Sequence, residues 1–271
     1  MALLQVNTFS QALSRIITFH IILSNDAPPE MLAGNSNYDR PMKTLYLLHG
    51  FSGSTQDWLT GSLIQELALK YNLAVVMPAG ENSFYLNGKG TGRGYETFTA
   101  VELPAYCQKT FGLSDKPEDN FIGGLSMGGF GAIHTALKYP EYFGKMFGLS
   151  SALIVNGIKG MKPGTHNDIA DYDYYAQIFG DLDQLEESEN NPEYIVNKRL
   201  KKGEKIQLVG FGTFMACGSE DFLLNENHEF RDFLLKNKVD FTYKESTGIH
   251  DWKFWNEYLE PAIEWLLESD K

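Results

Sequence analysis

The fold is indicated by one stretch, FIGGLSMGGF at residues 121–130. An apolar run that is typical of a strand leads into the pattern G-x-S-x-G at residues 124–128, and a helix-forming segment follows. A serine on such a sharp strand-to-helix turn is held in a strained conformation, so small neighbours are needed where the chain folds back on itself. Those small neighbours are present as Gly123, Gly128, Gly129 and Gly131. We therefore predict that Ser126 is the nucleophile.

Strands and helices are predicted to alternate on both sides of this turn. Short runs rich in apolar and β-branched residues predict strands at 15–23, which we take to open the sheet, and at 44–48, 73–77, 121–122, 145–149, 211–216 and 241–245. The intervening segments predict helices at 62–71, 97–111, 127–138, 225–238 and 254–269. This alternation is typical of an α/β fold with a mostly parallel central sheet and helices on both faces.

The alternation lapses after Ser150. Residues from about 155 to 205 are polar and rich in Asp and Glu, and they contain few apolar residues to bury. We interpret them as a helical insertion after the sixth strand rather than as a second domain. Residues 1–271 are accordingly expected to form a single domain.

Composition and charge exclude several classes of partner. The formal net charge of −12 argues against nucleic acid or an anionic membrane surface, because both would be repelled. The two cysteines provide neither a disulfide framework nor metal-ligand spacing. The first 24 residues lack the pattern of a secretory signal, and no long apolar run is present, so we expect a cytoplasmic protein.

A nucleophilic serine requires a base, and in this kind of fold the chain order is serine, then acid, then histidine. Two of the six histidines lie far enough along the chain. His228 falls within an expected helix, where an exposed position is favoured over a catalytic one. His250 lies in TGIHDW at 247–252, after the last expected strand and at the sheet edge where ligands bind in open α/β folds. We predict that His250 is the base.

The acid that orients this base should follow the penultimate strand. The segment CGSED at 217–221 places Glu220 and Asp221 at the same sheet edge as His250. Asp221 is the favoured acid. Asp251 is the competing carboxylate, but a side chain one position from His250 should point elsewhere.

Two backbone N–H groups are needed to stabilise the oxyanion. Met127, which follows the nucleophile, is expected to supply one of them. Phe51, in the loop HGFSG at 49–53 after an expected strand, is expected to supply the other. The alternative is that this loop is only a glycine-rich turn, and His49 is interpreted as a structural residue of the loop.

These segments resemble the tributyrin-esterase branch of the esterase D-like α/β-hydrolases, which are relatives of S-formylglutathione hydrolases, feruloyl and acetylxylan esterases, and mycolyltransferases. The resemblance runs nearly end to end and is carried by LQV at 4–6, LLHG at 47–50, YE at 95–96, ELP at 102–104, GLSMGG at 124–129, CG at 217–218, EDF at 220–222, and Gly248 two positions before His250. It maps Ser126, Asp221 and His250 onto the family triad, and Phe51 and Met127 onto its oxyanion hole. It implies hydrolysis of short-chain acyl esters without a metal or cofactor, often by a homo-oligomer.

The sequence is compatible with several substrate classes. The favoured function is a serine carboxylesterase that acts on small acyl esters through an acyl-enzyme on Ser126. A carbohydrate-linked ester, of acetyl-xylan or feruloyl type, is the main rival. S-formylglutathione hydrolases carry Leu-Thr-Cys where this chain has Phe51-Ser52-Gly53, which argues against a glutathione thioester. A non-catalytic binding module would typically lose a triad member, and here all three are present.

Aromatic residues are expected in the loops near this site. Their number suggests an apolar pocket for the acyl or alcohol group of the substrate. The residues concerned are Phe51, Trp58, Phe84, Tyr85, Tyr95 and Trp252.

Overall fold

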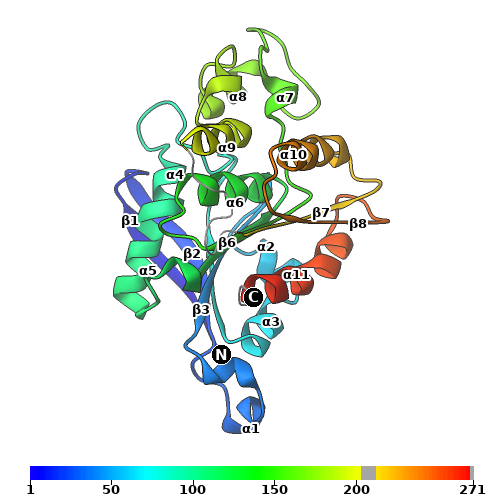
Figure 1. Ribbon diagram of the computed structural model, residues 1–271. Coiled ribbons are helices and arrows are strands. Elements are labelled where there is room, and N and C mark those ends of the chain that lie inside the picture. The colour runs from blue at the N-terminus through cyan, green and yellow to red at the C-terminus, as the bar shows by residue number, and fades with distance from the viewer. Residues whose placement is uncertain (203–211, 269–271) are drawn as a thin grey trace.

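The computed structural model describes residues 1–202 and 212–268, which fold around an eight-stranded sheet (Figure 1). Its spatial order is β1-β2-β4-β3-β5-β6-β7-β8. The strands are β1 (Ala2–Ser10), β2 (Arg15–Leu23), β3 (Lys43–Leu48), β4 (Leu73–Pro78), β5 (Asn120–Leu125), β6 (Lys145–Leu149), β7 (Gly212–Gly218) and β8 (Thr242–Ser246). The pairs β1–β2 and β2–β4 are antiparallel, and the remaining five pairs are parallel. The sheet is mostly parallel, as predicted.

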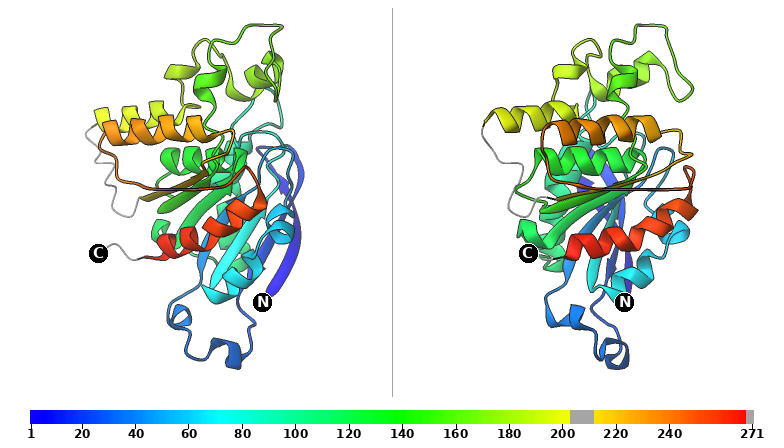
Figure 2. Two further views of the ribbon diagram at one scale, coloured as in Figure 1. Left: turned by 90° about the vertical axis from the view of Figure 1, so that its right-hand side faces the viewer. Right: turned by 45° about the vertical axis from the view of Figure 1, so that its right-hand side comes forward.

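Helices cover both faces of the sheet (Figure 2). Helices α2, α3 and α11 pack on one face, and α5, α6, α9 and α10 lie on the other. The helices are α1 (Pro29–Leu32), α2 (Asp57–Gly61), α3 (Ile64–Lys70), α4 (Tyr95–Thr97), α5 (Leu103–Phe111), α6 (Met127–Lys138), α7 (Val155–Ile158), α8 (Tyr172–Phe179), α9 (Pro192–Lys201), α10 (Leu224–Lys236) and α11 (Trp252–Leu267). Short helical turns are η1 (Ser36–Asp39), the π-helical η2 (Phe98–Glu102), η3 (Pro117–Asp119) and η4 (Leu185–Glu187).

The buried strands supply apolar side chains to both faces. In β3, Leu45 and Leu47 pack into the core beneath α3 and α11, whereas Tyr46 and Leu48 pack into the larger core on the opposite face. Successive residues of a strand point to opposite faces, so a strand covered on both sides reads as a continuous apolar run.

The parallel strands bring three chain segments to one edge of the sheet. Strands β5, β7 and β8 run in the same direction and end at Leu125, Gly218 and Ser246. Their carboxyl ends therefore meet at the edge where open α/β sheets bind ligands. The segments that follow contain the predicted nucleophile, acid and base.

The structure differs from the predicted elements in several places. The sheet opens with β1 rather than with β2, because ALLQVNTFS forms an exposed edge strand without regular apolar alternation. Strand β5 extends through Gly123 and Gly124, and a Cβ at Gly123 would overlap the ring of Phe147. The short helices α1 and α2 were not predicted. The predicted ends at Phe211 and Ser269 lie outside the described residues.

The helical insertion contributes to the main core, contrary to the expectation that it has little to bury. Its helices α8 and α9 bury Tyr175, Ile178, Phe179, Ile195 and Val196. The ring of Phe179 lies 5.0 Å from that of Phe84 and 5.7 Å from that of Phe130, measured between centroids. The apolar residues of α8 recur at helical spacing within acidic sequence, so average composition concealed the buried face. Helix α9 lies alongside α6, with α7 and α8 beyond it (Figure 1).

Replacing Phe179 by alanine tests whether the insertion is part of the core. Phe179 is 1% exposed, so Phe179→Ala should lower the free energy of unfolding by about 3–5 kcal/mol through lost burial and a cavity. Ile169→Ala, at an insertion residue that is 56% exposed, should change it by about 0.5 kcal/mol or less. Urea unfolding measures both variants. Equal effects would contradict the packing described above.

Candidate active site

Ser126 occupies a strained turn between β5 and α6. Its backbone has φ 53° and ψ −120°, in a region that residues with a side chain rarely adopt. Such a conformation persists when the surrounding structure over-determines it. The N–H of Ser126 donates to the carbonyl of Leu149 at 2.9 Å, and its carbonyl accepts from the N–H of Ala152 at 2.9 Å. The turn is thus held from β6 and from the segment that follows β6.

Close backbone approach explains one glycine of the motif. A Cβ on Gly128 would overlap the carbonyl groups of Leu48 and His49. The first turn of α6 can therefore pack against the end of β3 only with glycine at this position. The N–H of Met127 lies in that first turn, where backbone N–H groups have no partner within the helix.

The predicted acid and base are in direct contact. His250 Nδ1 lies 2.9 Å from Asp221 Oδ2 and 3.0 Å from Asp221 Oδ1. A carboxylate only accepts hydrogen bonds, so Nδ1 carries the proton and Nε2 is left as an acceptor. The imidazole contacts two aromatic rings, with centroid distances of 4.5 Å to Phe222 and 5.1 Å to Trp255. These contacts restrict the orientation of the ring.

The Asp221 carboxylate is ionised in spite of its burial. Its side chain is 0% exposed, whereas that of His250 is 16% exposed. Burial by itself raises the pKa of Asp221, but hydrogen bonds from His250, from the N–H of Leu223 and from Ser150 outweigh burial and hold this pKa below its ordinary value. The contribution of these contacts to the stability of the fold is therefore complete above the ordinary aspartate pKa. It is lost as the pH falls through the lower pKa that Asp221 has in the folded protein.

The neighbouring carboxylates lie elsewhere. Glu220 is exposed, and its backbone N–H donates to the carbonyl of Gly248 at 2.9 Å. Asp251 caps α11 by accepting from the N–H of Phe254 at 3.0 Å. The contact with His250 Nδ1 is made by Asp221.

The loop after β3 abuts the nucleophile. A Cβ on Gly50 would lie 3.5 Å from Ser126 Cβ. His49 Nδ1 donates to the carbonyl of Gly50 at 2.7 Å, while its Nε2 accepts from the N–H of Gly80 at 2.9 Å. Burial lowers the pKa of His49, which favours this neutral form. In a trans peptide the N–H points opposite to the C=O, so anchoring the carbonyl of Gly50 also sets the direction of the Phe51 N–H.

Two residues that the sequence analysis missed support the same loop. The side chain of Asn82 accepts from the N–H of Ser52 at 2.8 Å, and the carbonyl of Asn82 accepts from the hydroxyl of Tyr174 at 2.6 Å. The ring of Tyr174 meets that of Phe51 edge to face at 5.9 Å. Tyr174 belongs to α8, so the insertion contacts the expected oxyanion loop directly. The sequence carried no motif for either contact.

The other histidines have different partners. His20 Nδ1 lies 2.9 Å from the Thr55 hydroxyl, His134 Nε2 donates to the carbonyl of Glu189 at 2.7 Å, and His228 Nε2 lies 2.6 Å from Glu245. In the described part of the chain, no contact joins these three side chains to Asp221.

Most of the aromatic residues expected to line a pocket belong to the core. Trp58, Phe84, Tyr85 and Tyr95 are fully buried, and that part of the expectation was wrong. Phe51 and Trp252 are half-buried. Phe222, which was not among the expected pocket residues, is 64% exposed against His250. The composition of the loops did not reveal that most of these aromatic side chains pack in the core.

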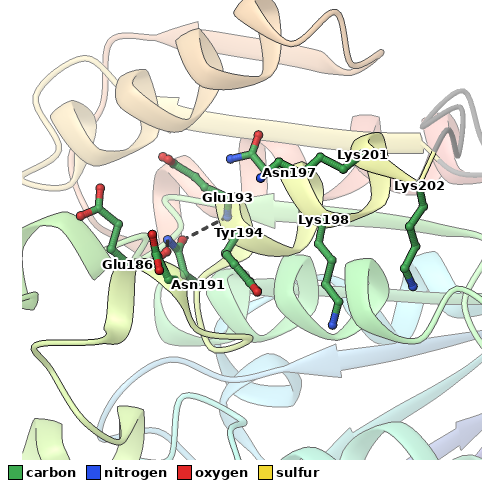
Figure 3. Close-up of a pocket in the computed structure, with 9 residues that line it drawn as sticks. Glu186, Asn191, Glu193, Tyr194, Asn197, Lys198, Lys201 and Lys202 are labelled. Carbon is green, nitrogen blue, oxygen red and sulfur yellow. Dashed lines mark hydrogen bonds between the residues drawn. The ribbon is translucent and has the colours of Figure 1, made fainter.

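A pocket of about 520 Å³ lies beside α9, away from these residues (Figure 3). Acidic and amide side chains surround the start of α9, Lys198 extends from its second half, and Lys202 directly follows its end. The lining residues are Glu186, Glu187, Asn191, Glu193, Tyr194, Asn197, Lys198, Lys201 and Lys202. They include none of the five predicted site residues.

Comparison with known proteins shows the family. Residues 10–198 match the family model described as "Putative esterase". The chain is 40% identical over 266 residues to an acetyl esterase of Caldicellulosiruptor saccharolyticus, which covers 98% of each chain. The chain therefore belongs to this esterase family.

Solved structures agree with this assignment. The fluorophosphonate-binding serine hydrolase F of Staphylococcus aureus matches with a TM-score of 0.82 and 28% identity, over 99% of each chain. An S-formylglutathione hydrolase of S. aureus matches with a TM-score of 0.80 and 28% identity, over 98% of this chain and 99% of that one. The chain has the α/β-hydrolase fold and is a carboxylic ester hydrolase of the serine type. In the residues that the structure describes, no helix has the length and apolar character needed to cross a membrane.

Proposed function

We propose that this protein hydrolyses short-chain acyl esters, with Ser126 as nucleophile, His250 as general base and Asp221 as the acid that orients it. The observation that carries the proposal is the 2.9 Å contact between His250 Nδ1 and Asp221 Oδ2 at the sheet edge where β5 turns into α6 at Ser126. Because its Nδ1–H donates to the carboxylate, the imidazole offers Nε2 to the serine proton.

The proposed reaction has two halves. Ser126 Oγ attacks the acyl carbon while its proton passes to His250 Nε2, and the N–H groups of Phe51 and Met127 bind the oxyanion. Collapse of this intermediate breaks the ester bond, and the departing alcohol takes the proton from Nε2. Water then attacks the acyl-enzyme with the same base, which releases the acid and restores Ser126.

The choice of a small acyl group rests on resemblance. The relative at 40% identity is an acetyl esterase, and the motifs of this chain resemble the tributyrin-esterase branch. The half-buried Phe51, whose ring meets that of Tyr174 edge to face, belongs to the loop of the expected oxyanion donor. We extend these observations to a preference for acetyl and butyryl esters.

Covalent labelling tests the nucleophile. A fluorophosphonate should modify the wild-type protein at Ser126, because an activated serine attacks such reagents. Peptide mass mapping identifies the modified residue. The Ser126→Ala variant should be neither labelled nor active, and labelling that persists in this variant would rule Ser126 out.

A series of p-nitrophenyl esters tests the acyl preference. We expect kcat/KM to be higher for acetate, butyrate and hexanoate than for palmitate, because the chain is similar to an acetyl esterase and resembles the tributyrin-esterase branch. Steady-state kinetics at a fixed alcohol group isolates the acyl effect. A higher kcat/KM for palmitate than for butyrate contradicts the preference.

Paired amide substitutions test the acid. Asp221→Asn keeps the shape but favours the wrong imidazole tautomer, so kcat should fall by about 10³- to 10⁴-fold, by comparison with serine proteases. Glu220→Gln is the matched control and should cost about tenfold at most, because an exposed side chain lies outside the contact. Circular dichroism checks that both variants are folded. If Glu220→Gln loses its activity and Asp221→Asn stays active, Glu220 is the acid that orients His250.

Two other substrate classes remain alternatives. The S-formylglutathione hydrolase among the similar structures supports a thioester, and the resemblance to acetylxylan and feruloyl esterases supports a carbohydrate-linked ester. Comparing kcat/KM for S-formylglutathione, acetylated xylo-oligosaccharides and p-nitrophenyl acetate on the same preparation separates the three. Higher activity on either of the first two substrates would replace the simple ester.

A further inference from the structure

Ser150 combines complete burial with an unfavourable backbone. It directly follows β6, is 0% exposed and has φ 47°, a value that favours glycine. Glycine would adopt this conformation without strain, so a buried serine here indicates a use for its hydroxyl. A conformational outlier of this kind is a reason to look for function.

The position of Ser150 lies between the strands of the proposed nucleophile and acid. The N–H of Ser126, past the end of β5, donates to the carbonyl of Leu149 in β6. One residue further along, the N–H of Ser150 donates to the carbonyl of Ala216 in β7 at 2.7 Å. Because β6 lies between β5 and β7, Ser150 stands at the same edge as both Ser126 and Asp221.

The Ser150 hydroxyl accepts one hydrogen bond from a buried side chain. Trp255 Nε1 donates to Ser150 Oγ at 3.1 Å. A hydroxyl that accepts one hydrogen bond keeps its own proton for another, and the Ser150 hydroxyl helps to hold the pKa of the Asp221 carboxyl below its ordinary value. The Cys217 thiol, near the end of β7, is a weaker acceptor than a carboxylate, because burial raises its pKa to about 12 and it stays neutral.

Trp255 links the same hydroxyl to the base. Its indole meets the His250 imidazole edge to face, with centroids 5.1 Å apart and an interplanar angle of 88°. The buried indole of α11 thus touches the imidazole through its ring and Ser150 through its N–H. The contacts therefore run from Ser150 to Trp255, from Trp255 to His250, and from His250 to Asp221.

We propose that Ser150 is a positioning residue for the esterase reaction proposed above: its hydroxyl, oriented by Trp255 Nε1, donates to Asp221 and fixes the carboxylate that holds His250 Nδ1. The carboxylate then has donors on several sides, from His250, Leu223 and Ser150. A buried carboxylate with this many fixed donors has little freedom to rotate, and the imidazole keeps the orientation that catalysis needs.

The next residue provides a matched control. Ser151 is also 0% exposed, and its hydroxyl has no hydrogen-bond partner among the described residues. Ser150→Ala and Ser151→Ala therefore remove the same group from equally buried neighbours, but only the Ser150 hydroxyl is held by a hydrogen bond, from Trp255 Nε1. Ser150→Gly removes the hydroxyl and also suits the left-handed backbone, so it keeps the experiment informative if alanine impairs folding.

Steady-state kinetics on p-nitrophenyl acetate is the first measurement. Ser150→Ala and Ser150→Gly should lower kcat by about tenfold or more, the loss expected for one hydrogen bond to a charged group, with KM nearly unchanged. Trp255→Phe keeps a ring against His250 and removes the N–H, so a smaller loss in kcat is expected. Ser151→Ala should match the wild type.

Proton NMR of the hydrogen bond between His250 Nδ1 and Asp221 gives a readout that does not depend on turnover. This resonance, assigned by its loss in Asp221→Asn, should move in both Ser150 variants and stay in place in Ser151→Ala. Unchanged kcat together with an unchanged resonance in Ser150→Gly overturns the positioning role. If the resonance moves in both Ser150 variants but the wild-type protein hydrolyses no ester, the positioning role is supported. The proposed function is then wrong.

Discussion

The N–H of Ser126 donates to the carbonyl of Leu149 across the gap between β5 and β6, and this bond holds a backbone turn that would otherwise relax. The positive φ at Ser126 is stable only because its surroundings over-determine it. Those surroundings include the carbonyl of Leu48, which approaches so closely that Gly128 cannot carry a side chain. The order β3-β5-β6 is therefore a requirement of the turn, since both neighbours of β5 contribute to it.

The same sheet order distributes the parts of the proposed site. The expected oxyanion loop follows β3, Ser126 follows β5, Ser150 follows β6, Asp221 follows β7 and His250 follows β8. Because these five strands are adjacent and parallel, their carboxyl ends form one continuous edge. Each chemical group thus arises from a different strand, and the rigid ladder of backbone hydrogen bonds sets the distances among them.

The parts of this arrangement that could be predicted from sequence are those with short-range signals. Glycines around Ser126, an apolar run before it and the chain order of serine, acid and histidine led to the elbow and to the pair Asp221 and His250. The missed contacts join residues far apart in the chain: Tyr174 bonds to a residue 92 positions away, and Trp255 to one 105 positions away. No local pattern encodes such contacts. The edge strand β1 was missed because Leu3 and Phe9 lie on its exposed face while Thr8 and Ser10 lie on its inner face, so the apolar alternation that marks a strand is absent.

The insertion links the core of the molecule to the expected oxyanion loop. One face of α8 buries Tyr175 and Phe179 in the main core, while Tyr174 contacts Phe51 and bonds to the segment that supports Ser52. A helix with one face in the core has a fixed position, and its contacts with the loop restrict the position of the loop as well. A substitution in α8 can therefore alter the surroundings of the acyl group without altering the sheet edge. In a fold whose sheet edge is tightly constrained, such a helix is a place where substrate preference can change while the catalytic geometry is retained.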